Sequence, residues 1–408
     1  MLLGVWVVYP AVSTIIRSFF DRAGDEFVWF ENYKELFTSD LLITAIKNNA
    51  LWIAVVPALV TALGLIFAVL TERVRWSVAF KTAVFMPMAI SLLAAGVIWR
   101  LMYVQDPDQG TLNAGIAAAK AVVQPTGALP TAEASTGQLV GRPGHTLTLK
   151  KPLAPGEVAQ LGLTAIPPEE IPADAKQAVK PQPIRNGITG VVWYDFKPGG
   201  GVPGKVEKQE KGLPGVTVEL RDSAGKSVGT ATAADDGTFS FEDLGPGRYT
   251  AAISGKTFAR PFGGFSWLGD KLITPAIMIA YIWVWAGFAM VVIAAGLAAI
   301  PRDVLEAART DGATEWQTFR RVTVPLLAPI LSVVFITMII NVLKVFDIVI
   351  SVAPSSSQDD ANVIALAMWR RSFSGENDFG VGSAIAVFLF LLVLPVLALN
   401  VRRFKREV

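Results

Sequence analysis

Residues 272–300 form a long apolar stretch without a charged side chain. A helix needs about 20 apolar residues to cross the hydrocarbon core of a bilayer. Two further uncharged stretches cover residues 50–70 and 381–400. The remaining three are shorter or carry a few charges, and they lie at 1–16, at 82–104 with Arg100, and at 326–352 with Lys344 and Asp347. The sequence therefore predicts an α-helical membrane protein with six transmembrane helices.

Composition supports this class and excludes several others. Hydrophobic residues make up 52% of the chain and charged residues 17%, whereas soluble domains carry about 25% charged residues. The formal net charge of +2 argues against a nucleic-acid-binding protein that works through bulk positive charge. The chain has no cysteine and one histidine, His145. We therefore expect no disulfide, no thiol nucleophile and no cysteine or multi-histidine metal site.

The basic residues of the short loops predict the orientation of the helices, because cytoplasmic loops carry more Lys and Arg than outer loops. With the N-terminus inside, the inner segments are 71–81, 301–325 and the C-terminal tail. Their basic residues are Arg73, Arg75, Lys81, Arg302, Arg309, Arg320, Arg321, Arg402, Arg403, Lys405 and Arg406, more than the short outer loops hold. We therefore expect both termini in the cytoplasm and the long segment between the third and fourth helices outside. The stretch 1–16 lacks a basic start and a cleavage site, so it indicates a span rather than a signal peptide.

The outer segment divides by composition into two parts. Residues 110–186 are rich in Pro and Ala, which is typical of a semi-rigid linker with little core of its own, apart from one possible strand at 146–149. Residues 187–256 alternate in polarity between turn signals. The expected strands are 190–196, 216–221, 227–233, 238–241 and 249–253. These patterns predict a small all-β sandwich, inserted between transmembrane helices 1–3 (residues 1–109) and helices 4–6 (residues 257–408).

Three segments of this sandwich, 211–216, 236–239 and 244–249, resemble the prealbumin-like B-type repeat of bacterial surface proteins. Some of those repeats bind calcium through an acidic loop after the first strand. The corresponding loop here, 197–205, has no carboxylate, so we expect no calcium site there. The same loop fits the spacing GxxxxGK, but Val206 follows where a phosphate loop needs Ser or Thr. We therefore expect a structural or docking module, and no ATP hydrolysis on this chain.

Residues 301–325 predict a short amphipathic helix, a break and a second helix. Pro301 suits the first helical turn, and Asp303 suits its positive end. Gly312 can end the helix in the left-handed conformation, and Pro325 leads into the next span. Trp316 and Phe319 are expected to pack back on the bundle. From these residues alone the helix could dock into a partner or lie on the membrane surface.

The motif in this segment favours docking. Glu306-Ala307-Ala308, then Gly312, then Val322-x-Val324-Pro325 resemble the EAA loop of binding-protein-dependent ABC importer permeases, with Val in place of Ile at 322 and of Leu at 324. Further similar segments lie at 30–33, 85–87, 98–100, 299–301 and 346–347. The resemblance covers the chain except the insert and is strongest to the carbohydrate branch, which includes the maltose permease.

The resemblance implies the helix arrangement of a type I ABC importer in a bacterial cell membrane. The implied partners are a second permease subunit, two ATPase subunits that bind ATP and Mg, an extracellular substrate-binding protein and membrane lipid; it implies no cofactor on this chain. In the EAA loop, Glu306 and Asp311 would contact the ATPase. Ala307 and Ala308 would allow close approach, and Gly312 would make the turn before Pro325.

The resemblance also implies a substrate path along the fourth and fifth helices. Its residues would be Trp283, Gly287 and Met290 on one helix and Asn341, Val342 and Val345 on the other. Trp283 could stack on a sugar ring, and Asn341 could bind hydroxyl groups. Packing and interhelical hydrogen bonding are the alternative roles. Lys344 and Asp347, three residues apart, could pair on one helix face.

The function expected from these features is that of a non-enzymatic permease subunit for a sugar or oligosaccharide. One alternative is a secondary transporter or channel that works without an ATPase, although the spans hold few ionisable residues. Another is a permease for a polyol or glycerol phosphate. A third is a membrane-anchored surface protein whose β module carries the activity.

Overall fold

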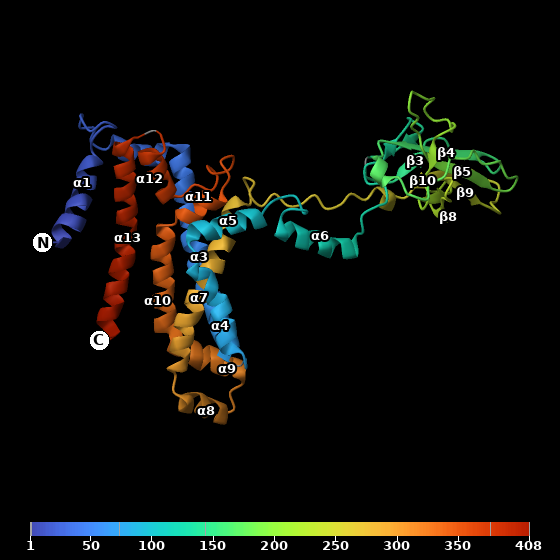
Figure 1. Ribbon diagram of the computed structural model, residues 1–408. Coiled ribbons are helices and arrows are strands. Elements are labelled where there is room, and N and C mark those ends of the chain that lie inside the picture. The colour runs from blue at the N-terminus through green and yellow to red at the C-terminus, as the bar shows by residue number, and fades with distance from the viewer. Residues whose placement is uncertain (1, 73, 143, 376, 408) are drawn as a thin grey trace. The chain divides into compact units, whose positions relative to one another are not determined.

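The computed structural model describes residues 2–72, 74–142, 144–375 and 377–407, with side chains up to residue 398. Arg73 and the side chains of the basic tail, both counted above for orientation, lie outside this description. The chain divides into two compact units, which are described separately. The helical unit comprises Met1–Asn113 and Phe265–Val408, and the β unit comprises Ala114–Gly264 (Figure 1).

The helical unit is built from helices of very different lengths. Its first part contains η1 (Gly4–Val8), α1 (Tyr9–Arg17), α2 (Glu31–Thr38), α3 (Asp40–Glu72), α4 (Ser77–Phe85), η2 (Met86–Ala89), α5 (Leu92–Met102) and the start of α6 (Thr111–Val123). Its second part contains α7 (Ile273–Ala298), α8 (Arg302–Thr310), α9 (Glu315–Thr318), η5 (Phe319–Thr323), α10 (Val324–Leu343), α11 (Asp347–Val352), α12 (Ile364–Phe373) and α13 (Phe379–Glu407).

Four helices in the described ranges are long and apolar enough to cross a membrane. They are Asp40–Glu72, Ile273–Ala298, Glu315–Leu343 and Phe379–Ala398. The bent pair of α4 with η2 and α5 raises this number to five if it counts as one span. The helix over Gly4–Arg17, at the first predicted stretch, is shorter than this length. Within the described ranges the structure thus shows four or five helices of membrane-spanning length, which does not confirm the expected number of six.

Two of the predicted spans are broken rather than continuous. The expected helix at 82–104 bends by 101° between α4–η2 and α5, where Ile90 is extended and the Ser91 hydroxyl caps α5 by accepting from the Ala94 amide at 3.2 Å. The expected helix at 326–352 ends at Leu343, and α11 begins at Asp347. The expected pairing of Lys344 with Asp347 on one helix face is therefore wrong, because the two residues do not share a helix.

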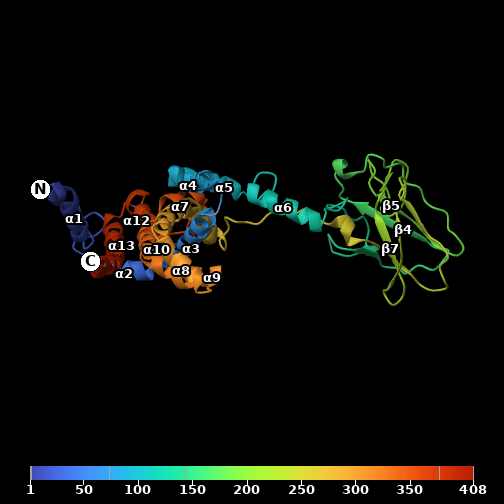
Figure 2. The same cartoon turned by 90° about the horizontal axis from the view of Figure 1, so that it is seen from below.

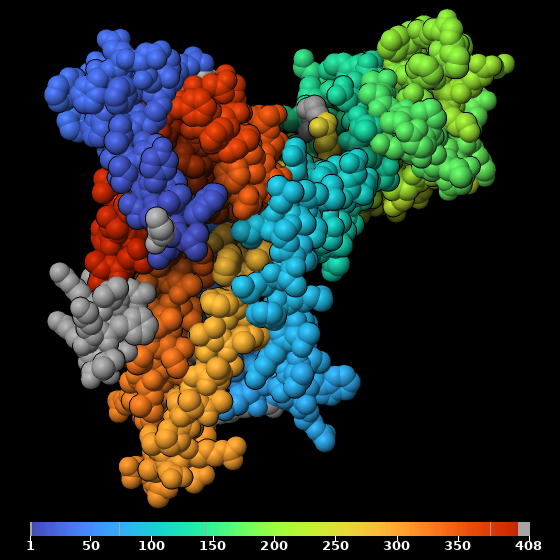
Figure 3. All heavy atoms as spheres, turned by 60° about the vertical axis from the view of Figure 1, so that its left-hand side comes forward, coloured from blue at the N-terminus to red at the C-terminus, as the bar shows by residue number. Residues whose placement is uncertain are grey.

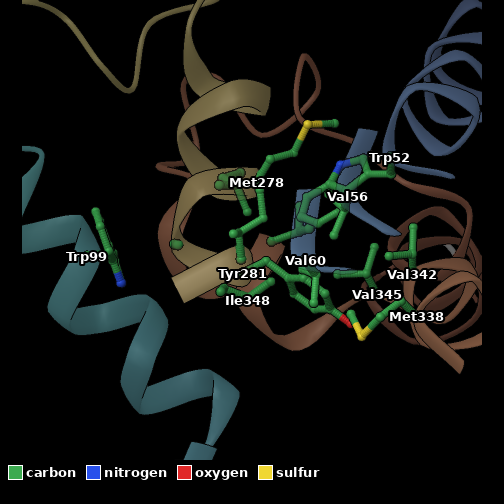
Figure 4. Close-up of a cluster of buried hydrophobic side chains, with 14 of the residues drawn as sticks. Trp52, Val56, Val60, Trp99, Met278, Tyr281, Met338, Val342, Val345 and Ile348 are labelled. Carbon is green, nitrogen blue, oxygen red and sulfur yellow. The ribbon is translucent and has the colours of Figure 1, made fainter. Parts of the chain in front are cut away.

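The core of the helical unit forms where α7 packs against α3 and α10 (Figures 1 and 2). Trp52 of α3 meets Tyr281 of α7 edge-on, with ring centroids 5.3 Å apart (Figure 4). Gly64 permits the close approach of α3 to α7, since a Cβ there would lie 2.9 Å from the Ala289 carbonyl carbon. Close packing through small residues is typical of helices in membranes. In lipid the hydrophobic effect does not drive helices together, so their association depends on van der Waals contact.

The β unit is a sandwich of two sheets, as its alternating sequence predicts. One sheet has the order β1 (Glu133–Ala134), β4 (Val158–Thr164), β5 (Ile188–Tyr194) and β6 (Lys211–Gly212), with β9 (Thr238–Phe241) also paired to β5. The other has the order β2 (Leu139–Val140), β3 (Leu147–Leu149), β10 (Thr250–Ile253), β7 (Thr217–Arg221) and β8 (Ser227–Thr232). The strands expected within 187–256, and the one at 146–149, are confirmed with small shifts at their ends.

The prediction that residues 110–186 form a linker with little core of its own is wrong. Its residues form α6 and β1 to β4, and β4 runs parallel to β5 in the first sheet. Leu161 and Leu163 of β4 are fully buried against the core that also contains Val192 of β5 and Val218 of β7. The compact unit therefore reaches from Ala114 to Gly264 rather than from 187 to 256. The proline-rich composition of the segment predicted a linker. The prolines lie between the strands, however, and β4 itself contains none.

Candidate coupling loop and transport path

The first half of the EAA loop is a capped helix with a closed C-terminal turn. Pro301 takes the N-cap position of α8, one residue before the helical turn in which it was expected. At the other end Gly312 has φ +83°. The Gly312 amide donates to the Arg309 carbonyl at 3.0 Å, and the Ala313 amide donates to the Ala308 carbonyl at 3.1 Å. These two bonds form a Schellman motif, which only a left-handed residue such as Gly312 completes without strain.

The second half of the loop is tied to the first. The Thr314 hydroxyl accepts from the Gln317 amide at 3.3 Å, and the Gln317 side-chain oxygen accepts from the Thr314 amide at 2.8 Å. This capping box starts α9. Arg309 Nε donates to Glu315 Oε1 at 3.0 Å and joins the last turn of α8 to the first turn of α9. This ion pair was not predicted from the sequence, although the opposite charges on either side of Gly312 indicate it.

The outer surface of the loop presents the residues named for ATPase contact. Glu306, Ala307, Asp311, Gly312 and Pro325 are exposed, and Ala308 is half-buried. Figures 1 and 3 show the loop at one end of the helical unit. Trp316 is 66% exposed and tilts against the half-buried Phe319 at 5.6 Å. The expectation that Trp316 packs back on the bundle is therefore wrong.

The inner surface of the loop lines an open pocket of about 350 Å³. Leu70 at the end of α3 and Leu297 at the end of α7 line one side, and Leu305 of α8 and Phe319 line the other. The Thr318 hydroxyl is buried there without a hydrogen-bond partner among the described residues. The loop thus touches the long helices through a few side chains while its fold is held by its own hydrogen bonds.

On α7, the three residues of the expected substrate path have different surroundings. Trp283 is 37% exposed and meets Trp99 of α5 edge-on, with ring centroids 5.7 Å apart. Gly287 lies against the backbone of α4, where a Cβ would overlap the Val84 carbonyl oxygen. Met290 is fully buried. In this conformation Trp283 has an accessible surface, while Gly287 and Met290 lie in contact with neighbouring parts of the helical unit.

The other expected path residues lie around the end of α10, with Asn341 and Val342 in its last turn and Val345 two residues beyond it. Asn341 is half-buried. Val342 and Val345 are buried in the cluster around Tyr281 (Figure 4). The structure therefore brings Val342, Val345 and Met290 into one apolar core and leaves Trp283 and Asn341 with accessible atoms. Lys344 and Asp347, at the break that follows, are both exposed.

Hydrogen bonds from buried polar residues fix the helices around this path. The Tyr103 hydroxyl donates to the Ala276 carbonyl at 2.8 Å and joins α5 to α7. The Asn49 side chain accepts from the Ile364 amide at 2.7 Å and joins α3 to α12. Sequence reasoning did not identify either bond, because a single Tyr or Asn in an apolar stretch does not reveal its partner. In the ranges described, no group of three or more His, Cys, Asp or Glu is placed to hold a metal.

Comparison with known proteins gives matches to two protein families and to relatives that include two proteins matched over the whole of this chain. Residues 238–406 match the binding-protein-dependent transport system inner membrane component, and residues 187–260 match the SdrD B-like domain. The chain is 28% identical to the osmoprotective compounds uptake permease protein GgtC of Synechocystis, covering 100% of this chain and 96% of that protein. It is also 28% identical to the alpha-glucoside transport system permease protein AglF of Rhizobium meliloti, covering 100% of this chain and 80% of the relative.

The fold is also found among solved structures. A chain in the crystal structure of a bacterial ABC transporter involved in the import of the acidic polysaccharide alginate superposes with a TM-score of 0.57 and 14% sequence identity, over 99% of this chain and 91% of that one. This similarity supports the type I importer architecture expected from the sequence. The putative ABC transporter permease protein ORF1 of Caldicellulosiruptor is 31% identical over 134 residues, which are 32% of this chain and 95% of that protein. With the family match over residues 238–406, this relative shows that the chain belongs to the family of binding-protein-dependent transport system inner membrane components.

Proposed function

We propose that this permease subunit forms one half of the translocation path of an ATP-driven importer for a sugar or oligosaccharide. In this proposal the chain has six spans, with the helices over Gly4–Arg17 and α4–α5 among them. Both termini and the EAA loop face the cytoplasm, and the β unit lies outside. The membrane is the bacterial inner or plasma membrane.

The observation that carries the proposal is the construction of the EAA loop. Its outer surface exposes the Glu306 and Asp311 carboxylates, and the Schellman turn, the capping box and the Arg309–Glu315 pair hold it as one piece. The helix that starts at Glu315 continues without a full break to Leu343. A force applied to α8 by an ATPase subunit would therefore move α10 as well. Alternating access in this proposal follows from that rigid connection.

The proposed substrate path uses the two accessible residues. Trp283 would offer an aromatic face to a sugar ring and Asn341 would offer a polar group to its hydroxyls. Gly287, Met290, Val342 and Val345 would position these two residues rather than touch the substrate in the conformation described. A saccharide agrees with the alpha-glucoside relative. The osmoprotectant relative keeps small polyhydroxylated solutes open as a second class.

The proposed partners follow from the same family. A second permease subunit would complete the path, two ATPase subunits would bind ATP and Mg, and an extracellular substrate-binding protein would deliver the substrate. The chain itself would catalyse no reaction.

Co-purification tests the proposal. The tagged chain and its Glu306→Lys variant are expressed in the native membrane, solubilised gently and analysed for bound proteins. Glu242→Lys is the matched control, because it makes the same charge change at an exposed residue of the β unit. We expect an ATPase and a second permease with the wild-type chain and with the control, and loss of the ATPase with Glu306→Lys. Recovery of the wild-type chain alone would instead favour a transporter or channel that works without an ATPase.

A further inference from the structure

One edge of strand β4 is open because the neighbouring chain changes sheets. β1 pairs with β4 only over Leu163 and Thr164. The Ser135 amide then donates to the Gly162 carbonyl at 3.0 Å. After this bond the chain crosses to the other sheet and becomes β2, which pairs with β3. The first part of β4, from Val158 onward, has a strand partner on the β5 side alone within the described ranges.

The backbone groups of Val158 and Gln160 point to this open edge. In a parallel pair, one residue directs its N–H and C=O to one neighbour and the next residue directs them to the opposite side. Leu163 bonds toward β5, since its carbonyl accepts from the Asp195 amide at 2.8 Å, and Gly162 bonds toward β1. The same alternation directs Val158 and Gln160 away from β5. Such an edge is a template for an added strand.

A groove of about 850 Å³ runs along this edge. Val158 and Gln160 line one side, and Leu149, the last residue of β3, and Leu153 line the other. Both leucines are almost fully buried and form part of the floor of the groove, whose lining is about as polar as it is apolar. The open part of β4 extends over roughly 13 Å at about 3.3 Å per residue. The groove therefore fits a short extended chain.

The charges around the groove favour a ligand of one sign. Lys150 and Lys151 line it and are exposed, and Arg248 donates to the Pro152 carbonyl at its rim at 3.0 Å. Glu157 is its one acidic residue in the described lining, and this carboxylate already accepts from the Ala154 amide at 2.7 Å and pairs with Lys151 at 3.6 Å. The excess positive charge favours an acidic ligand.

We propose that an extended acidic segment of a partner protein binds here by adding a strand to the open edge of β4. Its backbone pairs with Val158 and Gln160, alternate side chains lie over the floor that Leu149 and Leu153 form, and its carboxylates face the lysines. A sugar chain fits less well. The described lining residues include no aromatic ring to stack on a sugar, and a sugar lacks the alternating amides that pair with a strand.

Peptide binding to the full chain in detergent micelles tests this proposal. The probe is a fluorescein-labelled hexapeptide of alternating Glu and Val with blocked ends, measured by fluorescence anisotropy. One control peptide has the same sequence with alternate backbone amides N-methylated, and another has Lys in place of Glu. We expect binding of the first peptide and a dissociation constant at least about tenfold higher for either control. Absence of binding by the Glu-Val peptide overturns the proposal.

Variants of the chain locate the site. Gln160→Pro removes an amide hydrogen that bonds to no strand, and the preceding Ala159 lies within β4, where the residue before proline is readily accommodated. We expect it to raise the dissociation constant at least about tenfold, whereas Gln160→Thr, which keeps the amide, has little effect. Lys150→Glu weakens binding and Lys226→Glu, the same change in the β7–β8 turn, does not. The comparison of Lys150→Glu with Lys226→Glu tests the site even if Gln160→Pro does not fold.

Two other results overturn strand addition. One is binding that survives both N-methylation of the peptide and Gln160→Pro in a chain that unfolds at the wild-type temperature. The other is a chain that does not bind the peptide but binds maltoheptaose, and that loses maltoheptaose binding upon Lys150→Glu. The first would mean that side chains alone hold the ligand, and the second that the groove is a saccharide site.

Discussion

Arg309 and Glu315 form an ion pair across the glycine turn of the EAA loop, with Arg309 Nε 3.0 Å from Glu315 Oε1. Both side chains are about half exposed, at 50% and 57%. Exposed pairs contribute roughly 0–1 kcal/mol to folding. The pair joins α8 to α9, so we expect its geometry to matter more for transport than for the stability of the chain.

Charge reversal tests this connection. We expect Arg309→Glu and Glu315→Arg each to lower substrate uptake several-fold in membrane vesicles, because α8 would then move without α9. The double variant should recover a large part of the uptake, since the pair is restored with its charges exchanged. Bound ATPase is measured in the same vesicles. Uptake that is normal in both single variants would show that the pair has no role in coupling.

Gly287 tests the distinction between packing and substrate contact. A Cβ at this position would overlap the α4 backbone, and such overpacking costs about 1–3 kcal/mol. We expect Gly287→Val to lower the thermal unfolding temperature of the purified chain. Gly263→Val is the control, because a Cβ there meets no atom within 4 Å. Loss of substrate binding by Gly287→Val at an unchanged unfolding temperature would instead indicate direct contact with the substrate.

Leu161 tests the assignment of β4 to the core of the β unit. The side chain is fully buried, and truncation of such a leucine costs about 2–5 kcal/mol. We expect Leu161→Ala to lower the unfolding temperature of the β unit strongly. Val179, in the same part of the chain, is 48% exposed, so Val179→Ala should change stability by less than about 0.5 kcal/mol. Equal, small effects would support the linker interpretation.

Glu210 makes stability of the β unit depend on pH. It is 1% exposed, and burial raises the pKa of this carboxyl above its ordinary value of 4.5, with a further rise from Asp195 and Glu207 that a hydrogen bond from the Glu207 amide partly offsets. The folded state therefore holds this proton more tightly than the unfolded state. Its stabilisation is complete below pH 4.5 and is lost as pH rises through the raised pKa.

The matching experiment compares unfolding temperatures at pH 5 and pH 8. We expect Glu210→Gln, which stays neutral, to be more stable than the wild-type chain at pH 8 and to gain less on acidification. Glu242→Gln changes an exposed carboxyl and should follow the wild-type curve. If Glu210→Gln shows the wild-type difference between the two pH values, Glu210 is not the group responsible.

Much of the architecture could be predicted from local sequence. The stretches 50–70, 272–300 and 381–400 lie in long helices, since the free energy of burying an apolar stretch in lipid is a sum over its own residues. The turn at Gly312 was predicted for a similar reason, because a left-handed residue and its two hydrogen bonds involve only near neighbours. The strands β5 and β7 follow from alternation between turn residues.

The tertiary structure decided what depends on residues far apart in the chain. Gly287 was named for a substrate path, and the structure places the α4 backbone against it, a neighbour that no pattern around residue 287 reveals. Leu161 is buried because β5 lies beside β4, and a proline-rich flank gave no indication of that partner. Helix, turn and strand tendencies are local free energies, which the sequence by itself determined. Burial, the break between Leu343 and Asp347, and the open edge of β4 depend on which segments meet, and only the packed structure decides that.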